Sequence, residues 1–328
     1  MEAPGVVSSM VLLVIADPAA PFLTALSNVP QRVRTIVSAD REQLKVNAPQ
    51  ADAILFAHFD GSLLAAVLPL AERARWIHSL WTGVDWIPKP ELLKHPAPLT
   101  NGRGVFRWPL ADWVVAAMLF FAFDLRRVIQ QQQERVWKAF MSTTLEGRTL
   151  GIVGYGSIGR AAATRARPFG MKIAALRRRP ELFESDALVD LNYGPAQLHT
   201  LLAASDYVVV STPLTDATRG LIGETEIAVM KPTAVIINIG RGPVIDESAL
   251  VRALQSGVIR GAALDVFNIE PLPSDHPFWK MPNVLLSPHT ADRVEGFLLP
   301  AFECFFENLD RFLSGSALLN LVDKHAGY

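Results

Sequence analysis

The sequence contains a single cysteine, Cys304, among 328 residues, so an internal disulfide is impossible. No neighbouring residue has the spacing of a metal ligand, and we therefore expect no metal site and interpret Cys304 as a small hydrophobic residue. The low cysteine count fits a reducing compartment. The formal net charge is only -1 at pH 7, which leaves no overall field that would attract nucleic acid or a membrane of anionic lipid.

Long hydrophobic segments are also lacking. The apolar run at residues 113–123 is too short to span a bilayer. The N-terminus has no basic region of the kind found in secretion signals, and its apolar stretch at residues 11–15 is typical of a first strand. We expect a cytoplasmic protein.

Short apolar runs separated by longer amphipathic stretches, such as residues 158–166 and 247–255, dominate the rest of the chain. The runs are continuous rather than alternating in polarity, as in strands buried on both faces, and the order of the segments predicts parallel sheets built from βαβ units. A chain of this length favours two lobes. The expected strands are residues 11–15, 54–59, 150–153, 172–176, 207–210, 234–237, 262–266 and 284–286.

One long helix is predicted at residues 109–133, with Pro109 in its first turn. Its first half is apolar on nearly every side, which indicates burial on every side. It could be a core helix between lobes or part of a subunit interface, and these readings do not exclude each other.

A glycine-rich turn follows the expected strand at residues 150–153 and precedes a helical pattern. Its residues are Gly154, Tyr155, Gly156, Ser157, Ile158 and Gly159. A GxGxxG string alone is weak evidence for dinucleotide binding, and the alternative is a plain tight turn. Here, however, strand, turn and helix occur in the order that a dinucleotide site requires. The first glycine permits the turn, the second admits the pyrophosphate, and the third lets helix and strand pack closely.

The next strand ends in a cluster of arginines, namely Arg177, Arg178 and Arg179. An NAD enzyme places a carboxylate here for the ribose 2′-hydroxyl, whereas guanidinium groups favour the 2′-phosphate. We therefore predict a preference for NADP(H), with NAD(H) still possible because Glu181 lies nearby. The alternative is a solvated basic turn that binds no ligand.

Three residues at later strand ends have the chemistry needed to reduce a 2-oxo acid. Arg241 offers a planar cationic fork for the carboxylate, and His289 titrates in the range needed to protonate the carbonyl oxygen. Glu270 would orient the imidazolium and raise its pKa. Each alone could be an ordinary surface, turn or core residue; the three together, at the carboxyl ends of parallel strands, predict an active site.

These motifs together resemble the D-isomer-specific 2-hydroxyacid dehydrogenase family, and the similarity covers nearly the whole chain. Its arginine cluster is most similar to that of the glyoxylate/hydroxypyruvate reductases. The motifs that carry the resemblance are the glycine turn, Ser211-Thr212-Pro213-Leu214-Thr215, Asn238-Ile239-Gly240-Arg241-Gly242, Asp265-Val266-Phe267 with Glu270-Pro271-Leu272-Pro273, and Ser287-Pro288-His289.

The resemblance implies an α/β fold of two lobes. A Rossmann dinucleotide-binding domain at residues 108–293 would be inserted in a discontinuous, flavodoxin-like substrate domain at residues 1–107 and 294–328, with the active site in the cleft between them. It also implies a homodimer that forms through the long helix.

Further site residues follow from the resemblance. Asp265 would hold the nicotinamide carboxamide, and the backbone N–H groups of Thr82 and Gly83 would grip the substrate carboxylate alongside Arg241. Trp81 is either a core aromatic or part of the substrate pocket. Asp112 and the segment at residues 290–293 depart from the usual pattern, which puts substrate detail in doubt. The residues expected to line the cofactor are Thr212, Pro213, Thr218 and Ile239.

Two alternatives remain open. One is a reductase of the same family that acts on larger 2-oxo acids. The other is a non-catalytic, nucleotide-sensing scaffold like the corepressors related to this family, which retain a similar trio. The near absence of tails and of a basic face disfavours the scaffold.

Overall fold

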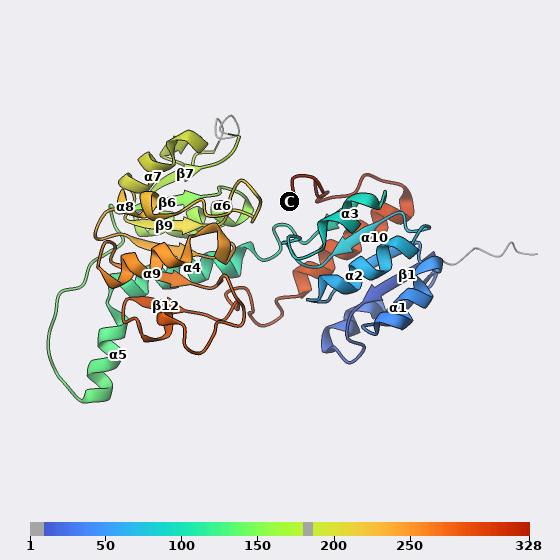
Figure 1. Ribbon diagram of the computed structural model, residues 1–328, viewed down its shortest axis with the longest axis horizontal. Helices are drawn as coiled ribbons and strands as arrows, with labels where there is room; N and C mark the ends of the chain where they lie inside the picture. Colours follow the sequence, from blue (N-terminus) through green and yellow to red (C-terminus); the bar gives the residue numbers. More distant parts are fainter. Residues whose placement is uncertain (1–9, 180–185) are drawn as a thin grey trace, which may run out of the picture. The chain divides into compact units, whose positions relative to one another are not determined.

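The computed structural model describes residues 10–179 and 186–328, which belong to two compact units (Figure 1). The first unit combines residues up to Phe106 with Gly296–Tyr328, and the second is Arg107–Glu295. The first division falls one residue earlier, and the second two residues later, than the boundaries expected from the sequence.

The first unit is built on a parallel sheet of five strands in the order β2-β1-β3-β4-β5. This is the flavodoxin-like order, and it confirms that part of the predicted fold. Asp40 and Asp60 cap the helices that follow β2 and β3, because their side chains accept hydrogen bonds from first-turn N–H groups. The elements are β1 (Met10–Ile15), β2 (Val33–Ser38), α1 (Arg41–Asn47), β3 (Ala53–Phe56), α2 (Gly61–Val67), β4 (Ile77–Ser79), α3 (Lys89–Lys94), β5 (Leu99–Asn101) and α10 (Leu299–Ser314), with 3-10 helices η1 (Pro21–Asn28), η2 (Ala48–Gln50) and η3 (Leu68–Leu70).

The second unit contains a parallel sheet of seven strands in the order β12-β11-β10-β9-β6-β7-β8. Counted within the unit, this is the doubly wound Rossmann order with one further strand at an edge, as the motifs predicted. The elements are α4 (Arg107–Ala122), α5 (Leu125–Glu134), β6 (Thr149–Val153), α6 (Ser157–Ala166), β7 (Lys172–Leu176), β8 (Leu191–Tyr193), α7 (Leu198–Ala204), β9 (Tyr207–Val210), α8 (Glu224–Ala228), β10 (Val235–Asn238), α9 (Glu247–Gln255), β11 (Gly261–Leu264) and β12 (Val284–Leu286), with η4 (Arg167–Phe169), η6 (Pro195–Gln197), η7 (Gly242–Val244) and η8 (Pro277–Lys280).

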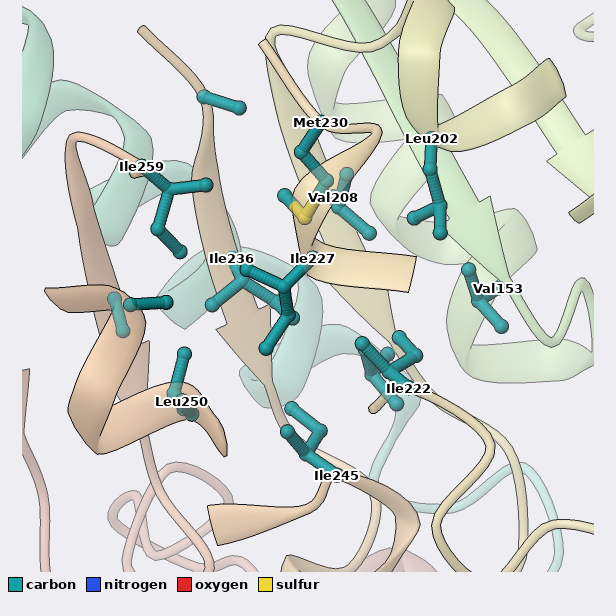
Figure 2. Packing of buried hydrophobic residues seen from close by; sticks show 14 of the residues in the cluster. Val153, Leu202, Val208, Ile222, Ile227, Met230, Ile236, Ile245, Leu250 and Ile259 are labelled. Atoms are coloured by element: carbon teal, nitrogen blue, oxygen red, sulfur yellow. The ribbon is translucent and has the colours of Figure 1, made fainter. Parts of the chain in front are cut away.

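A buried aliphatic cluster fixes the central strands of the second unit. Val208 on β9 and Ile236 on β10 are fully buried, and Figure 2 shows them beside Ile227 of α8 and Leu202 of α7. Such strands are apolar without interruption because helices cover the sheet. With the strands held parallel, the loops that carry the expected site residues all leave the same edge of the sheet.

The prediction of a single long helix at residues 109–133 is wrong. The structure has two helices, α4 and α5, bent by 61° at a break where Asp124 adopts a left-handed conformation with φ 49°. α4 is also buried on one side only: Val114 and Met118 face the core, whereas Trp108 and Ala116 are exposed. The apolar composition of this segment therefore indicated more burial than the chain provides.

Within the described ranges, no single helix is long and apolar enough to cross a membrane. Only the bent pair of α4 and α5 meets that criterion when taken together.

Candidate active site

The glycine turn after β6 has the geometry expected of a dinucleotide-binding loop. Gly154 has φ 98°, and a Cβ there would lie 2.7 Å from the backbone nitrogen of Thr212. A side chain at Gly159 would meet the carbonyl oxygen of Gly154 at 2.8 Å, so the start of α6 packs directly on the turn. Both positions therefore require glycine on steric grounds.

The space above this turn fits a phosphate group. A Cβ at Gly156 would meet no atom of the described residues within 4 Å, and both Gly156 and Ser157 are exposed at the start of α6. Ile158 is half-buried beside them. The unpaired N–H groups and the positive end of the dipole of a ten-residue helix thus face an open space.

A polar atom on the neighbouring strand end also fits a bound ligand. The hydroxyl oxygen of Thr212 is buried and has no hydrogen-bond partner among the residues that the structure describes. Pro213 beside it is exposed, and Ile239 at the end of β10 is buried. The hydroxyl of Thr218 donates to Pro213 O at 2.6 Å and accepts from Thr215 N at 2.8 Å, so it stabilises the loop that carries Pro213.

Arg177, Arg178 and Arg179 follow the last residue of β7, and the second and third are exposed. Tyr155 in the glycine turn donates a hydrogen bond from its hydroxyl to Asp186 at 3.1 Å. Arg160 donates to the same carboxylate oxygen at 2.9 Å. Burial, followed by the charge and hydrogen bond of Asp186, pushes the pKa of Tyr155 above its usual range, so the phenol stays neutral.

The turn that presents Arg241 is held by the preceding strand. The side chain of Asn238, at the end of β10, donates to Arg241 O at 3.1 Å and accepts from Gly240 N at 3.1 Å. Asn238 is buried, so this clamp is shielded from water. The guanidinium group donates to Gly240 O at 2.8 Å.

The Arg241 turn is locked against the loop that carries Glu270. A Cβ at Gly242 would lie 2.0 Å from the carbonyl carbon of Phe267, so the two backbones touch there. Phe267 N donates to one carboxylate oxygen of Glu270 at 2.9 Å, and Asn268 N donates to Glu247 at 3.1 Å. These contacts fix the relative positions of the arginine and the carboxylate.

The structure brings Glu270 and His289 into direct contact, with 2.6 Å between the glutamate Oε2 and the imidazole Nδ1. The hydrogen bond to Glu270 raises the pKa of His289 above its usual value, against the opposing effect of burial. Burial opposes ionisation of Glu270, but hydrogen bonds from His289 and from Phe267 N–H, with the charges of His289 and Arg241, outweigh it and lower the pKa of Glu270. Both pKa shifts therefore favour the charged pair, an imidazolium beside a carboxylate.

The backbone conformation of His289 orients its imidazole ring. His289 has φ 52°, a left-handed conformation that few residues with a side chain adopt. Its N–H donates to Asp265 O at 2.9 Å. Asp265 is buried, and its Oδ1 accepts from the Ser287 hydroxyl at 2.6 Å and from the N–H groups of Thr290 and Ala291 at 2.9 and 3.1 Å. Asp265 thus fixes the segment on both sides of His289.

The first unit carries a loop with unused N–H groups. After β4, the carbonyl oxygens of Trp81, Thr82 and Gly83 accept hydrogen bonds from Gly102 N at 3.2 Å, Asn101 Nδ2 at 2.6 Å and Trp86 Nε1 at 2.8 Å. Over the described ranges, the N–H groups of Thr82 and Gly83 donate to no protein atom. Carbonyls turned inward and free N–H groups are the arrangement expected of an anion site.

Several supporting residues were not predicted from the sequence. Asn238 and Ser287 lie in the family motifs, and a polar residue at the end of a buried strand was the signal that could have identified them. Asp186 had no such signal, because it contacts Tyr155 only in the folded chain. In residues 10–179 and 186–328, no group of three His, Cys, Asp or Glu could hold a metal ion.

Comparison with known proteins gives consistent results. The NAD-binding domain of D-isomer specific 2-hydroxyacid dehydrogenases matches residues 115–291. A glyoxylate reductase of Korarchaeum cryptofilum is 39% identical over 272 residues, 79% of either chain. A glyoxylate/hydroxypyruvate reductase B of Pectobacterium carotovorum is 37% identical over 259 residues, 77% of this chain and 80% of the relative.

A similar solved structure is the NADPH-dependent glyoxylate/hydroxypyruvate reductase of Sinorhizobium meliloti in complex with NADP and sulfate. Its TM-score is 0.83 at 27% identity, with 97% of this chain and 100% of that chain covered. Three observations indicate the same family: the sequence match, the two sheet topologies and the Glu270–His289 pair. This chain belongs to the D-isomer-specific 2-hydroxyacid dehydrogenase family and is an oxidoreductase.

Proposed function

We propose that this enzyme uses NADPH to reduce small 2-oxo acids of the glyoxylate and hydroxypyruvate type to D-2-hydroxy acids. The observation that carries the proposal is the 2.6 Å contact between Glu270 and His289, in a unit whose Arg241 is held by the clamped turn beside them. The relatives named as glyoxylate reductases support the substrate class.

Each residue of the site has a separate role in the reaction. Arg241, with the free N–H groups of Thr82 and Gly83, binds and orients the substrate carboxylate. A nicotinamide cofactor, held by the glycine turn and the arginine cluster, would supply the hydride for carbon 2 of the acid. His289 donates its proton to the carbonyl oxygen, and Glu270 stabilises the imidazolium until that transfer. Asp265 positions His289 and is expected to bind the nicotinamide carboxamide.

The reaction is tested by mixing purified protein with NADPH and a panel of 2-oxo acids and following the absorbance of reduced nicotinamide. We expect oxidation with glyoxylate and hydroxypyruvate, and faster turnover with NADPH than with NADH. Binding of NADPH without oxidation by any acid would instead support the nucleotide-sensing scaffold.

The arginine cluster gives a cofactor prediction. Replacing Arg177 and Arg178 together by alanine is expected to raise the KM for NADPH by about 10- to 100-fold and to leave that for NADH nearly constant, because only NADPH has the 2′-phosphate. The control is Arg252→Ala, since Arg252 is an exposed arginine on α9 paired with Glu224 at 2.9 Å. Equal losses with both cofactors would contradict the assignment.

The Glu270–His289 pair gives a pH prediction. Because the pKa of His289 is raised, the proton donor persists above pH 6.5, and reduction declines only as the pH rises through that raised pKa. In Glu270→Gln the carboxylate is lost, so the declining limb of kcat/KM moves to lower pH. If kcat/KM of Glu270→Gln declined over the same pH range as that of the wild type, Glu270 would not set the charge of His289.

We also propose a homodimer formed through an apolar arm, defined as residues 123–141. In Figure 1, α5 projects from its unit and the following segment returns beside it. Arg127 lies 4.2 Å from the ring centroid of Phe140, which joins helix and return segment. An apolar surface of this kind marks a protein interface. Its exposed apolar residues are Phe123, Leu125, Val128, Ile129, Val136, Trp137 and Met141.

Sedimentation equilibrium checks this proposal. The wild type, with a chain mass of 35.9 kDa, is expected to sediment at twice that mass. A variant with both Val128 and Ile129 replaced by glutamate is expected to sediment as a monomer, because two charges would be buried without partners. A wild type that is monomeric at high concentration would contradict the proposal.

A further inference from the structure

The N–H groups proposed to bind the substrate carboxylate are oriented by hydrogen bonds to the carbonyl groups beside them. A trans peptide bond is planar, so the carbonyl oxygen of one residue and the N–H of the next point in opposite directions. The peptide bonds after Trp81 and Thr82 are both trans. Gly102 N donates to Trp81 O at 3.2 Å and thereby orients the N–H of Thr82. Asn101 Nδ2 donates to Thr82 O at 2.6 Å and thereby orients the N–H of Gly83.

The same hydrogen bonds make the two N–H groups better donors. A peptide group whose oxygen accepts a hydrogen bond is polarised, and its N–H then interacts more strongly with an anion. Asn101 is only 3% exposed, so water screens its bond to Thr82 little. A further bond joins the same two segments, because the Thr82 hydroxyl donates to Gly102 O at 2.9 Å. The anion site of this loop therefore depends on residues 101 and 102.

Residues 101–103 are held in turn by Asn320, which lies in the segment after α10. Asn101 N donates to Asn320 O at 3.3 Å. The side-chain nitrogen of Asn320 donates to Asn101 O at 3.2 Å and to Arg103 O at 3.0 Å, the two carbonyls on either side of Gly102. Asn320 has φ 54°, a left-handed conformation that asparagine adopts more readily than most residues with a side chain.

A buried asparagine of α10 anchors the segment that carries Asn320. Asn308 is fully buried, and its Oδ1 accepts from Leu319 N at 2.7 Å. Its Nδ2 donates to Leu319 O at 3.2 Å, so both backbone groups of the residue before Asn320 are fixed. A buried amide that loses such partners is costly, which keeps the arrangement in place. We call Asn308, Asn320 and Asn101 the asparagine relay.

We infer that the asparagine relay positions the carboxylate-binding N–H groups and thereby sets the affinity for the 2-oxo acid. The inference rests on the proposed function, because it concerns residues behind the proposed substrate contacts. The relay acts through Thr82 and Gly83, so its members are positioning residues. Every 2-oxo acid has the same carboxylate, and the relay therefore affects the KM of all such acids rather than the choice among them.

Asn320→Gly is the sharpest test, because glycine adopts the left-handed conformation freely and the change removes only the side-chain hydrogen bonds. We expect the KM for glyoxylate and the inhibition constant of oxamate, an unreactive carboxylate analogue, to rise together by about three- to tenfold. The kcat and the KM for NADPH are expected to stay within about twofold of the wild type, as for a loss of uniform binding.

Asn101→Leu provides a second variant, since leucine has a similar size but cannot donate to Thr82 O. We expect its KM for glyoxylate to rise by about 10- to 100-fold, because the Thr82–Gly83 peptide loses its hydrogen bond directly. The control is Asn47→Ala in the same unit. Asn47 ends α1, donates to Gln43 O at 2.8 Å and accepts from Gln50 Nε2 at 2.9 Å, and its replacement should leave the KM for glyoxylate unchanged.

The outcomes distinguish the inference from the proposed function. Turnover of glyoxylate by Asn320→Gly and Asn101→Leu with the wild-type KM would overturn the inference and leave the proposed function standing. Variants that lose kcat at constant KM, or in which the KM for NADPH rises as much as that for glyoxylate, would indicate a general structural role and would also overturn it. Absence of turnover by the wild type with every acid would overturn the proposed function, and the inference with it.

Discussion

Replacing His289 by alanine is expected to lower kcat for 2-oxo acid reduction by about 10²- to 10⁴-fold, the range for loss of a positioned general acid. The variant keeps Arg241, so the KM for the acid changes less than kcat. In the wild type Glu270 contacts Nδ1 at 2.6 Å, which leaves Nε2 as the ring atom that can give a proton to the substrate. Water would have to supply that proton in the variant.

The control for this prediction is His199→Ala. His199 also pairs with a carboxylate, Glu226, at 2.8 Å, but the pair lies on α7 and α8 and includes none of the residues assigned to the reaction. Loss of a histidine–carboxylate pair as such therefore occurs in both variants, and only His289→Ala should lose turnover. A His289→Ala variant within about threefold of wild-type kcat would remove His289 from the chemistry.

Replacing Arg241 by alanine is expected to raise the KM for the 2-oxo acid by about 10- to 100-fold, the effect of losing hydrogen bonds to a charged group. The KM for NADPH provides an internal control, because the arginine is assigned to the acid. Arg241→Lys keeps the charge without the planar fork and should recover only part of the affinity.

A second readout separates binding from proton transfer. The charge of Arg241 lowers the pKa of His289, so Arg241→Ala should also move the alkaline limb of activity to higher pH. If Arg241→Ala chiefly lowered kcat while His289→Ala chiefly weakened acid binding, the two roles would have to be exchanged.

The central strands of both units were predictable because burial on both faces leaves a continuous apolar run. β7, β9 and β12 begin and end as expected. β2 and β8 were overlooked: they lie at sheet edges, where half-exposed positions carry polar residues. β4 and β5 were also overlooked, because they are only three residues long and contain polar residues. Hydrogen bonds offset the cost of burying these residues: the hydroxyl of Thr100 accepts from Trp76 Nε1 at 2.9 Å.

The break between α4 and α5 could not be read from the sequence. Apolar periodicity continues through Phe123, and Asp124 gives little warning because a left-handed residue depends on the packing around it. In the site, motif order and residue chemistry predicted that Glu270 and His289 meet, and the structure confirms their contact. The clamps that hold them, such as Asn238 on the Arg241 turn, involve ordinary polar residues whose partners only folding brings near.

We propose that the guanidinium of Arg241 binds the carboxylate and the imidazolium of His289 the carbonyl oxygen of the same 2-oxo acid. A crystal structure of the enzyme with NADP⁺ and oxamate, an unreactive analogue of such acids, tests it most directly. We expect the carboxylate within hydrogen-bond distance of Arg241 and of the N–H groups of Thr82 and Gly83, and the carbonyl oxygen on His289 Nε2. An analogue bound with its carbonyl oxygen out of reach of His289, or its carboxylate held without Arg241, would contradict the account.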